Sequence, residues 1–191
     1  MTAANLFEIV VMCTGNRFRS PIVEYLLRRS VEGLPVHVRS FGQLDISPIP
    51  VLPEALEEAR RFGLDLSGHR ATALAGVDLS GVDLVIGFER AHIAHAVIAA
   101  KAPLERTFTL PELVQVLERL PAVPGDDDVP AAARATIAAA AAERPSDPRQ
   151  AKLPEVPDPL GRPRNVAARV ADDLRDLTER LVLRLFGRRA R

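Results

Sequence analysis

The chain has 191 residues, a length that suits one domain with its own core, and 47% of them are hydrophobic. Lysine and arginine total 25, as do aspartate and glutamate, so net charge gives no reason to expect a nucleic-acid or membrane partner. The single cysteine excludes an intramolecular disulfide and a cysteine-based structural zinc site.

Residues 1–12 lack a basic region followed by a long apolar stretch, so we expect no signal peptide. The apolar runs elsewhere are too short to cross a bilayer. We therefore expect a cytoplasmic protein, because a reducing compartment would keep the one thiol reduced.

Strand and helix patterns alternate along the chain. The nearly continuous apolar run at 6–12 is typical of a strand buried on both faces of a parallel sheet. Ser20 and Pro21 then give a helix-start signal, with Ser20 as the N-cap. The later patterns predict a strand at 35–41, a helix at 52–62 that ends at Gly63, a strand at 83–88, a helix at 89–100, a short strand at 107–110 and a helix at 111–120. This alternation predicts an α/β layered fold with a parallel sheet.

The last third of the chain differs in composition. Residues 121–150 combine prolines, an acidic run at 126–128 and an alanine-rich stretch at 131–142. We interpret 121–150 as a surface insertion that carries one helix, within a single domain that spans residues 1–191. Apolar residues then recur at three- and four-residue steps, which predicts a long amphipathic final helix at about 164–187.

The segment 13–20, CTGNRFRS, joins the first predicted strand to the first predicted helix. Such a junction forms an anion site, because backbone N–H groups point into the loop and the helix dipole adds positive charge. These surroundings favour the thiolate, which is the reactive form of cysteine. Arg19 supplies a planar fork for two phosphate oxygens. We expect Gly15 to allow the tight turn, and Asn16 to hold a strained backbone through its side chain.

A lone cysteine at a strand end is more often a small buried hydrophobe than a nucleophile. The C-x5-R spacing, followed by Ser-Pro at a helix start, is more specific than a cysteine alone and favours Cys13 as a catalytic nucleophile.

The run CTGNRFRSP at 13–21 resembles the signature of the low-molecular-weight protein tyrosine phosphatase family, in which cysteine, five residues, arginine, serine and proline follow the first strand. The resemblance covers about residues 6–186 and implies a three-layer α/β/α sandwich with a central four-stranded parallel sheet. It implies a reaction without metal or other cofactor on a phosphorylated protein, with phosphotyrosine as the default, or on a small phosphomonoester. We expect a monomer or weak dimer. The phosphate-binding residues would be Thr14, Gly15, Asn16, Arg17, Phe18 and Arg19.

In that family an aspartate in an Asp-Pro pair before the last helix is the general acid, and Asp158-Pro159 stands at the matching place. The pair at 147–148 fits less well, since it is closer to the insertion. The resemblance implies that Cys13 attacks phosphorus and that Asp158 protonates the leaving oxygen, then activates water against the phosphocysteine. Arg19 would hold the phosphate oxygens throughout, and Ser20 would donate to the Cys13 sulfur.

Ser40 and His69 match a serine and a histidine that, in relatives, join the loop asparagine and serine in a hydrogen-bond network; here these would be Asn16 and Ser20. Glu89 falls where relatives have an acidic residue at a strand end. His92 and His95 lie three apart on the following predicted helix, and with no third ligand apparent we assign them to the helix surface, not to a metal.

Three positions depart from the family pattern. Phe18 replaces a second loop cysteine that many relatives carry, so oxidised Cys13 would need an external thiol. Arg17 stands where tyrosine-specific relatives have an aliphatic residue and arginine-phosphatase relatives have a threonine. Arg17 is either a contact for acidic substrates or a solvated residue at the rim of the site. Leu160-Gly161 replaces the aromatic residue that usually walls the phosphotyrosine ring.

Two other functions stay open. An arsenate reductase on the same fold that uses a small external thiol needs only Cys13, although Ser20-Pro21 resembles the phosphatase loop better. A non-catalytic module that binds phosphate or a phosphoprotein would keep the loop, but it requires neither the thiol nor Asp158.

Overall fold

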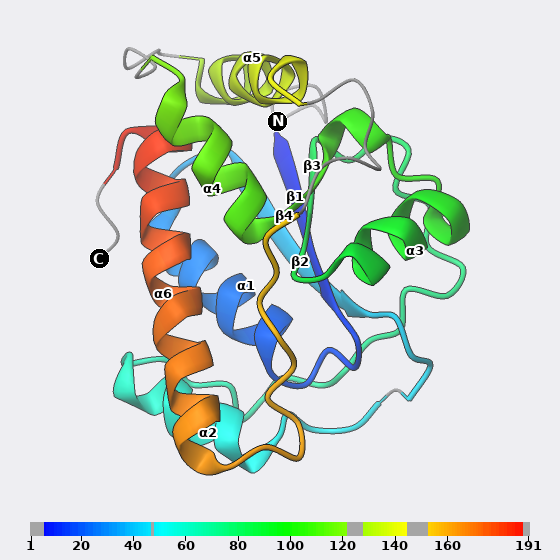
Figure 1. The fold of residues 1–191 in the computed structure, drawn as a ribbon, viewed down its shortest axis with the longest axis vertical. Coiled ribbons are helices and arrows are strands. Elements are labelled where there is room, and N and C mark those ends of the chain that lie inside the picture. Colours follow the sequence, from blue (N-terminus) through cyan, green and yellow to red (C-terminus); the bar gives the residue numbers. More distant parts are fainter. Residues whose placement is uncertain (1–5, 47, 122–127, 145–152, 189–191) are drawn as a thin grey trace.

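A parallel sheet of four strands forms the centre of the molecule. The structure is a computed structural model that describes residues 6–46, 48–121, 128–144 and 153–188 (Figure 1). The strands lie side by side in the order β2-β1-β3-β4, and their bounds are β1 (Phe7–Cys13), β2 (Val36–Gly42), β3 (Leu84–Gly87) and β4 (Thr107–Thr109). The predicted α/β fold with a four-stranded parallel sheet is confirmed.

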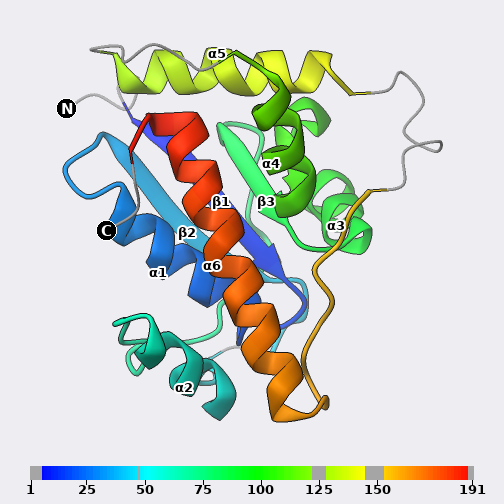
Figure 2. The same cartoon turned by 60° about the vertical axis from the view of Figure 1, so that its left-hand side comes forward.

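Helices cover both faces of this sheet. They are α1 (Arg19–Ser30), α2 (Pro53–Arg61), α3 (Arg90–Ala100), α4 (Leu110–Arg119), α5 (Val129–Ala142) and α6 (Arg164–Phe186), with one 3-10 turn, η2 (Leu104–Arg106). One face packs against α1, α4 and α6, and the other packs against α3, which gives three layers (Figures 1 and 2).

The alternation of side chains along β1 decides which layer each one enters. Ile9, Val11 and Cys13 belong to the core under α1 and α6, whereas Val10 and Met12 belong to the core under α3. All are buried, which explains why this strand has an almost unbroken apolar sequence. Cys13 therefore ends β1 on the side from which α1 departs.

The strand order also places a ligand-binding position at the end of β1. The chain passes from β1 outward to β2, then crosses back to β3 on the other side of β1. In open parallel sheets, ligands bind beyond the carboxyl ends of the strands where the order reverses in this way. The segment 13–19 lies at that point.

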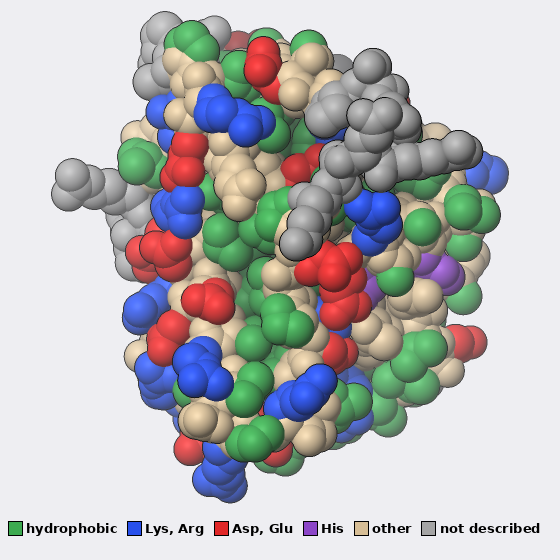
Figure 3. All heavy atoms as spheres, viewed as in Figure 1, with side chains coloured by type: hydrophobic (Ala, Val, Ile, Leu, Met, Phe, Trp, Pro, Cys, Tyr) green, Lys and Arg blue, Asp and Glu red, His purple; other side chains and the backbone are tan. Residues whose placement is uncertain are grey.

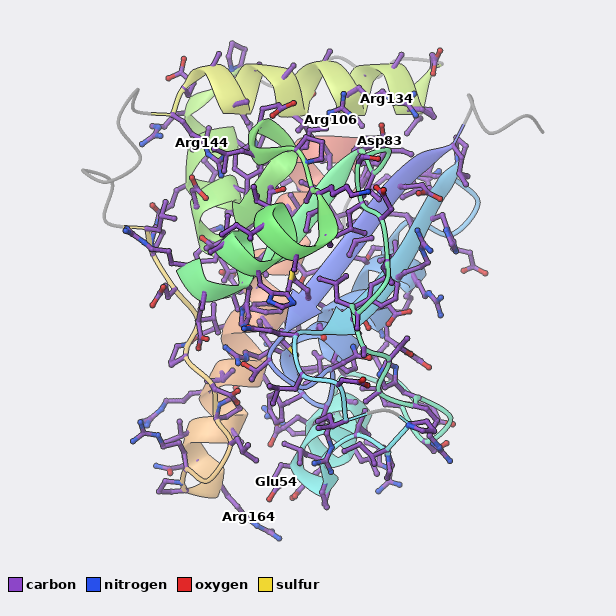
Figure 4. All side chains as sticks on the ribbon, turned by 90° about the vertical axis from the view of Figure 1, so that its right-hand side faces the viewer. Glu54, Asp83, Arg106, Arg134, Arg144 and Arg164 are labelled. Atoms are coloured by element: carbon purple, nitrogen blue, oxygen red, sulfur yellow. The ribbon has the colours of Figure 1, made fainter. Side chains whose placement is uncertain are left out.

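Helix α5, in the segment 121–150, lies across the opposite end of the sheet (Figures 1 and 2). The Arg134 guanidinium donates to the carboxylate of Asp83, just before β3, and to the carbonyl oxygen of Leu6, just before β1 (Figure 4). Ala133, Ile137 and Ala140 are buried in the main core. The described part of this segment therefore contributes to the core and provides no wall for the loop at 13–19. The pair at 147–148 lies outside the described residues.

The start of α1 differs from the prediction. The helix begins at Arg19 and its N-cap residue is Phe18, so Ser20 is not the cap. The Ser20 hydroxyl instead contacts Cys13 and Asn16, as described below, because it lies inside the first turn, facing the loop. Pro21 is also in the first turn, where an absent N–H breaks no intrahelical hydrogen bond.

The exposed face of α6 carries alternating charges (Figure 3). Arg180 pairs with Glu118 of α4 and with Asp176 one turn earlier in α6. Among the described residues, no helix has the length and the apolar composition that a bilayer crossing needs.

Candidate active site

The loop from Cys13 to Arg19 is held in shape by Asn16. Asn16 has a φ of 53°, so the left-handed backbone conformation falls there, while Gly15 is not among the residues with positive φ. The expectation that Gly15 makes the tight turn is therefore wrong, and the strained position is Asn16. Its side chain can hold that backbone because it is fully buried and makes hydrogen bonds on both the oxygen and the nitrogen.

Gly42, at the end of β2, allows the loop to pack closely on the sheet. A Cβ at Gly42 would lie 3.0 Å from the carbonyl carbon of Gly15 and 3.1 Å from the nitrogen of Asn16. Both atoms are backbone, so a side chain at Gly42 would move the loop. Backbone hydrogen bonds from Gln43 to Cys13 and from Leu44 to Thr14 then fix the following segment against the loop.

The Cys13 sulfur accepts hydrogen bonds at the base of the loop. The backbone N–H of Asn16 lies 3.2 Å from Sγ, and the Ser20 hydroxyl oxygen lies 3.1 Å from it. Ser20 Oγ itself accepts from Nδ2 of Asn16 at 2.9 Å, which leaves its hydrogen to donate to the sulfur. Two donors aimed at one sulfur stabilise negative charge on it, which a nucleophilic thiolate requires.

The four residues expected to form a network do come together. Asn16 Nδ2 also donates to the Ser40 hydroxyl at 2.7 Å, and Ser40 donates to the carboxylate of Glu24. His69 Nε2 faces two oxygens of Asn16, the backbone carbonyl at 3.1 Å and Oδ1 at 3.2 Å, so this nitrogen carries the proton. Burial lowers the pKa of His69 below its ordinary value, against an opposing effect of Glu24.

Glu24 is a member of this network that the sequence analysis missed. It lies four residues after Ser20, on the same face of α1, and its side chain is buried, which is unusual for a glutamate. That spacing was the available signal. Glu24 accepts from Ser40 and thereby fixes the direction in which the Ser40 hydroxyl points.

Arg19 is buried, with 1% of its side chain exposed, and has acceptors on both terminal nitrogens. Nη1 donates to Glu89 at 2.8 Å and to the carbonyl oxygen of Val156 at 2.9 Å. Nη2 donates to the Thr14 hydroxyl at 3.1 Å and to Asp158 Oδ2 at 2.6 Å. A buried guanidinium held on both sides keeps one orientation, and here Nη2 lies beside the pocket residues Thr14 and Asp158.

Asp158 reaches the loop from a segment more than a hundred residues away. The backbone N–H of Val156 bonds the carbonyl oxygen of Phe88 at 2.9 Å, which attaches this segment to the end of β3. Oδ1 of Asp158 accepts from the backbone N–H of Leu160 at 3.0 Å, which orients the carboxylate. Asp158 thereby lines the same pocket as Cys13.

The pocket itself has a polar base and an apolar rim. It is open to solvent and is lined by Cys13, Thr14, Gly15, Arg17, Phe18, Arg19, Leu44, Ile46, Leu52, Asp158 and Leu160. Three of the lining residues, Leu44, Ile46 and Leu160, have exposed side chains. Few other large hydrophobic side chains in the described residues are exposed. Arg17 is fixed at the rim because its Nε donates to the carbonyl oxygen of Pro50 at 2.9 Å.

The sequence analysis also misplaced His92. Its side chain is fully buried, so the assignment to the helix surface is wrong. Nδ1 accepts from the backbone N–H groups of Phe88 and Glu89, and Nε2 lies 3.2 Å from the Thr14 hydroxyl. Burial, with the charge of Arg19, lowers the pKa of His92 to about 4. The available signal was its place in the first turn after β3, at the edge of the sheet where the loop lies.

Comparison with known proteins decides the family. The model of the low molecular weight phosphotyrosine protein phosphatase family matches residues 8–119, which is more than half of the chain. The chain belongs to this family of hydrolases. The match includes the loop at 13–19, whereas Asp158, which contacts Arg19, lies beyond the matched residues.

Individual relatives agree with this membership. The chain is 36% identical over 107 residues to a probable low molecular weight protein-tyrosine-phosphatase, EpsP, of Ralstonia nicotianae, a match that spans 56% of this chain and 72% of that protein. It is 37% identical over 103 residues to the phosphatase Etp of Escherichia coli, over 54% of this chain and 67% of the other. A low molecular weight phosphatase structure from T. tengcongensis superposes with a TM-score of 0.66 at 25% identity, over 92% of this chain and 97% of that one.

Proposed function

We propose that this family member is a protein tyrosine phosphatase that hydrolyses phosphomonoesters through a phosphocysteine on Cys13. The observation that carries the proposal is the convergence of three groups on one pocket: the Cys13 sulfur, the Arg19 guanidinium and the Asp158 carboxylate. A module that only binds phosphate needs neither the sulfur with its two donors nor a carboxylate beside the cation.

In the first step the Cys13 thiolate attacks phosphorus while the bond to the ester oxygen breaks. The loop N–H groups and Arg19 stabilise the negative charge on the three remaining oxygens. Asp158, in its protonated form, gives its proton to the departing oxygen. The products of this step are a phenol or alcohol and a phosphocysteine.

In the second step water attacks the phosphocysteine. Asp158, now a carboxylate, accepts a proton from the attacking water, and the sulfur leaves as a thiolate. The Ser20 hydroxyl, 3.1 Å from Sγ, stabilises the charge that returns to the sulfur. Inorganic phosphate then dissociates, and both Cys13 and Asp158 have recovered their starting states.

The rim of the pocket supports an aromatic leaving group. Leu44, Ile46 and Leu160 present apolar surface around the mouth, where a phenyl ring would lose contact with water. These aliphatic side chains stand in for the aromatic wall that the sequence lacks after Asp158-Pro159. Arg17 at the same rim disfavours a cationic leaving group such as a guanidine, and it favours acidic residues beside the phosphotyrosine.

The experiment is hydrolysis of p-nitrophenyl phosphate across pH, without added metal, by the wild type and by Cys13→Ser and Asp158→Asn. We expect turnover in the wild type, none in Cys13→Ser, and no effect of a chelator. A phosphotyrosine peptide should be hydrolysed with a higher kcat/KM than glycerol phosphate. No turnover by reduced, folded wild type would overturn the proposal, and thiol-dependent arsenate reduction would then be the next activity to measure.

A further inference from the structure

The hydrogen bonds of His92 fix which of its ring nitrogens carries a proton. Nδ1 lies 3.2 Å from the backbone nitrogen of Phe88 and 3.1 Å from that of Glu89, and both groups are donors. Nδ1 must therefore be unprotonated, since a ring N–H would meet two backbone N–H groups. The ring is buried and neutral at physiological pH, so its one proton is on Nε2.

This tautomer makes His92 a donor to the phosphate loop. Nε2 lies 3.2 Å from Oγ1 of Thr14, the residue after the nucleophile. A second oxygen near Nε2, Oε2 of Glu89, is 3.6 Å away, which is too far for a hydrogen bond. Glu89 is in any case paired with Arg19 through its other oxygen.

Thr14 Oγ1 receives a second donor from the opposite side. Nη2 of Arg19 lies 3.1 Å from the same oxygen. A hydroxyl oxygen has two lone pairs, and here both are taken by N–H groups. Among the described residues, no acceptor contacts the Thr14 hydroxyl, so its hydrogen is left to donate elsewhere. Thr14 lines the pocket beside Cys13.

We propose that His92 is a positioning residue for the substrate phosphate. By donating to Thr14 Oγ1, it makes the Thr14 hydroxyl a hydrogen-bond donor to a phosphate oxygen in the loop. This inference rests on the proposed function, because it assigns the anion in the loop as phosphate. Without the His92 N–H, Thr14 could turn its hydrogen toward the ring and present a lone pair to the anion, which is repulsive.

Two substitutions of His92 distinguish the roles of its two ring nitrogens, the acceptor Nδ1 and the donor Nε2. The side-chain oxygen of His92→Asn can replace Nδ1 as the acceptor for the two backbone N–H groups, but it leaves no donor at the Nε2 position. The amide nitrogen of His92→Gln can replace Nε2 as the donor. At Thr14, valine removes the hydroxyl while keeping the shape, and serine keeps the hydroxyl.

The measurement is the Kd of inorganic phosphate by titration calorimetry, which requires no turnover and so does not depend on whether the protein hydrolyses esters. We expect Thr14→Val to weaken phosphate binding about tenfold or more, the effect of losing a hydrogen bond to an anion, and Thr14→Ser to stay within about threefold of wild type. His92→Asn should weaken binding about fivefold or more, and His92→Gln less. In the Thr14→Val background, His92→Asn should change the Kd by less than about twofold.

Equal weakening by His92→Asn in the wild-type and Thr14→Val backgrounds would overturn the proposal, because His92 would then act through something other than the hydroxyl. Wild-type affinity in Thr14→Val would also overturn it, and that result is informative even if every His92 variant fails to fold. A thermal unfolding curve for each variant shows which of them are folded.

Discussion

Oδ2 of Asp158 lies 2.6 Å from Nη2 of Arg19, so the candidate general acid and the candidate phosphate-binding cation hold each other. Phosphate entering the loop must compete with this carboxylate for the guanidinium. A phosphate dianion also repels a neighbouring carboxylate.

This competition predicts opposite effects of Asp158→Asn on catalysis and on binding. We expect kcat for p-nitrophenyl phosphate to fall about a hundredfold, because the proton donor is lost. The affinity for inorganic phosphate should rise by about threefold or more, because Arg19 is released and a negative charge is removed. Weaker phosphate binding by the variant would contradict this account of the pair.

Gly42 is not among the residues that line the pocket, yet Gly42→Ala should reduce activity. The new Cβ would approach the backbone of Gly15 and Asn16 to 3.0 and 3.1 Å, so the loop must shift. Small displacements of catalytic groups are costly, and we expect kcat/KM for p-nitrophenyl phosphate to fall about tenfold or more. Gly68→Ala is the control, since a Cβ there meets nothing within 4 Å. Wild-type kcat/KM in a folded Gly42→Ala variant would show that the loop is not held by this contact.

Ser20→Ala should slow the second chemical step more than the first. The variant removes the hydroxyl 3.1 Å from the Cys13 sulfur, which stabilises the leaving thiolate. We expect kcat to fall about tenfold, with a pre-steady-state burst of p-nitrophenol as phosphocysteine accumulates. Ser30→Ala, which removes only a hydroxyl bonded to the Leu26 carbonyl later in α1, should show neither change. A fall in kcat without a burst would assign Ser20 to the first step instead.

His92 should make folding stability depend on mildly acidic pH. Its pKa is lowered from 6.5 to about 4 in the folded protein. Between these values the unfolded chain binds a proton that the folded chain does not, so stability is complete above about 6.5 and falls as pH drops toward 4. The loss from this residue would reach about 3 kcal/mol. Urea unfolding across this range should show a shallower pH dependence for His92→Asn than for wild type, and equal dependences would contradict the assignment.

The sequence was sufficient to predict the elements whose signals are local. Three such signals are the apolar run of β1, the proline and glycine at the ends of α2, and the periodicity of α6. Each signal lies within one continuous stretch of sequence, and the structure has these elements at nearly the predicted bounds. The segment from Cys13 to Ser20 could be recognised for the same reason, since the nucleophile, the arginine and the serine lie in one short loop.

Contacts between distant parts of the chain were harder to predict. Ser20 has the residue type of an N-cap, but its hydroxyl is used by Cys13 and Asn16, and only the folded loop shows this. His92 was assigned to the helix surface because no third metal ligand was apparent, yet it is buried, and its Nε2 lies 3.2 Å from the Thr14 hydroxyl, 78 residues away in sequence. Glu24 was missed since a carboxylate inside a helix is usually solvated.

The central claim, that Cys13 carries the phosphoryl group during turnover, is tested most directly by trapping that group. Wild-type protein is mixed with p-nitrophenyl phosphate, quenched rapidly, digested and examined by mass spectrometry, with Cys13→Ala as the control. The account predicts one added phosphoryl group on the peptide that contains Cys13, present during turnover and absent once the substrate is exhausted. Turnover by Cys13→Ala, or wild-type turnover with the phosphoryl group on another residue or on none, would contradict it.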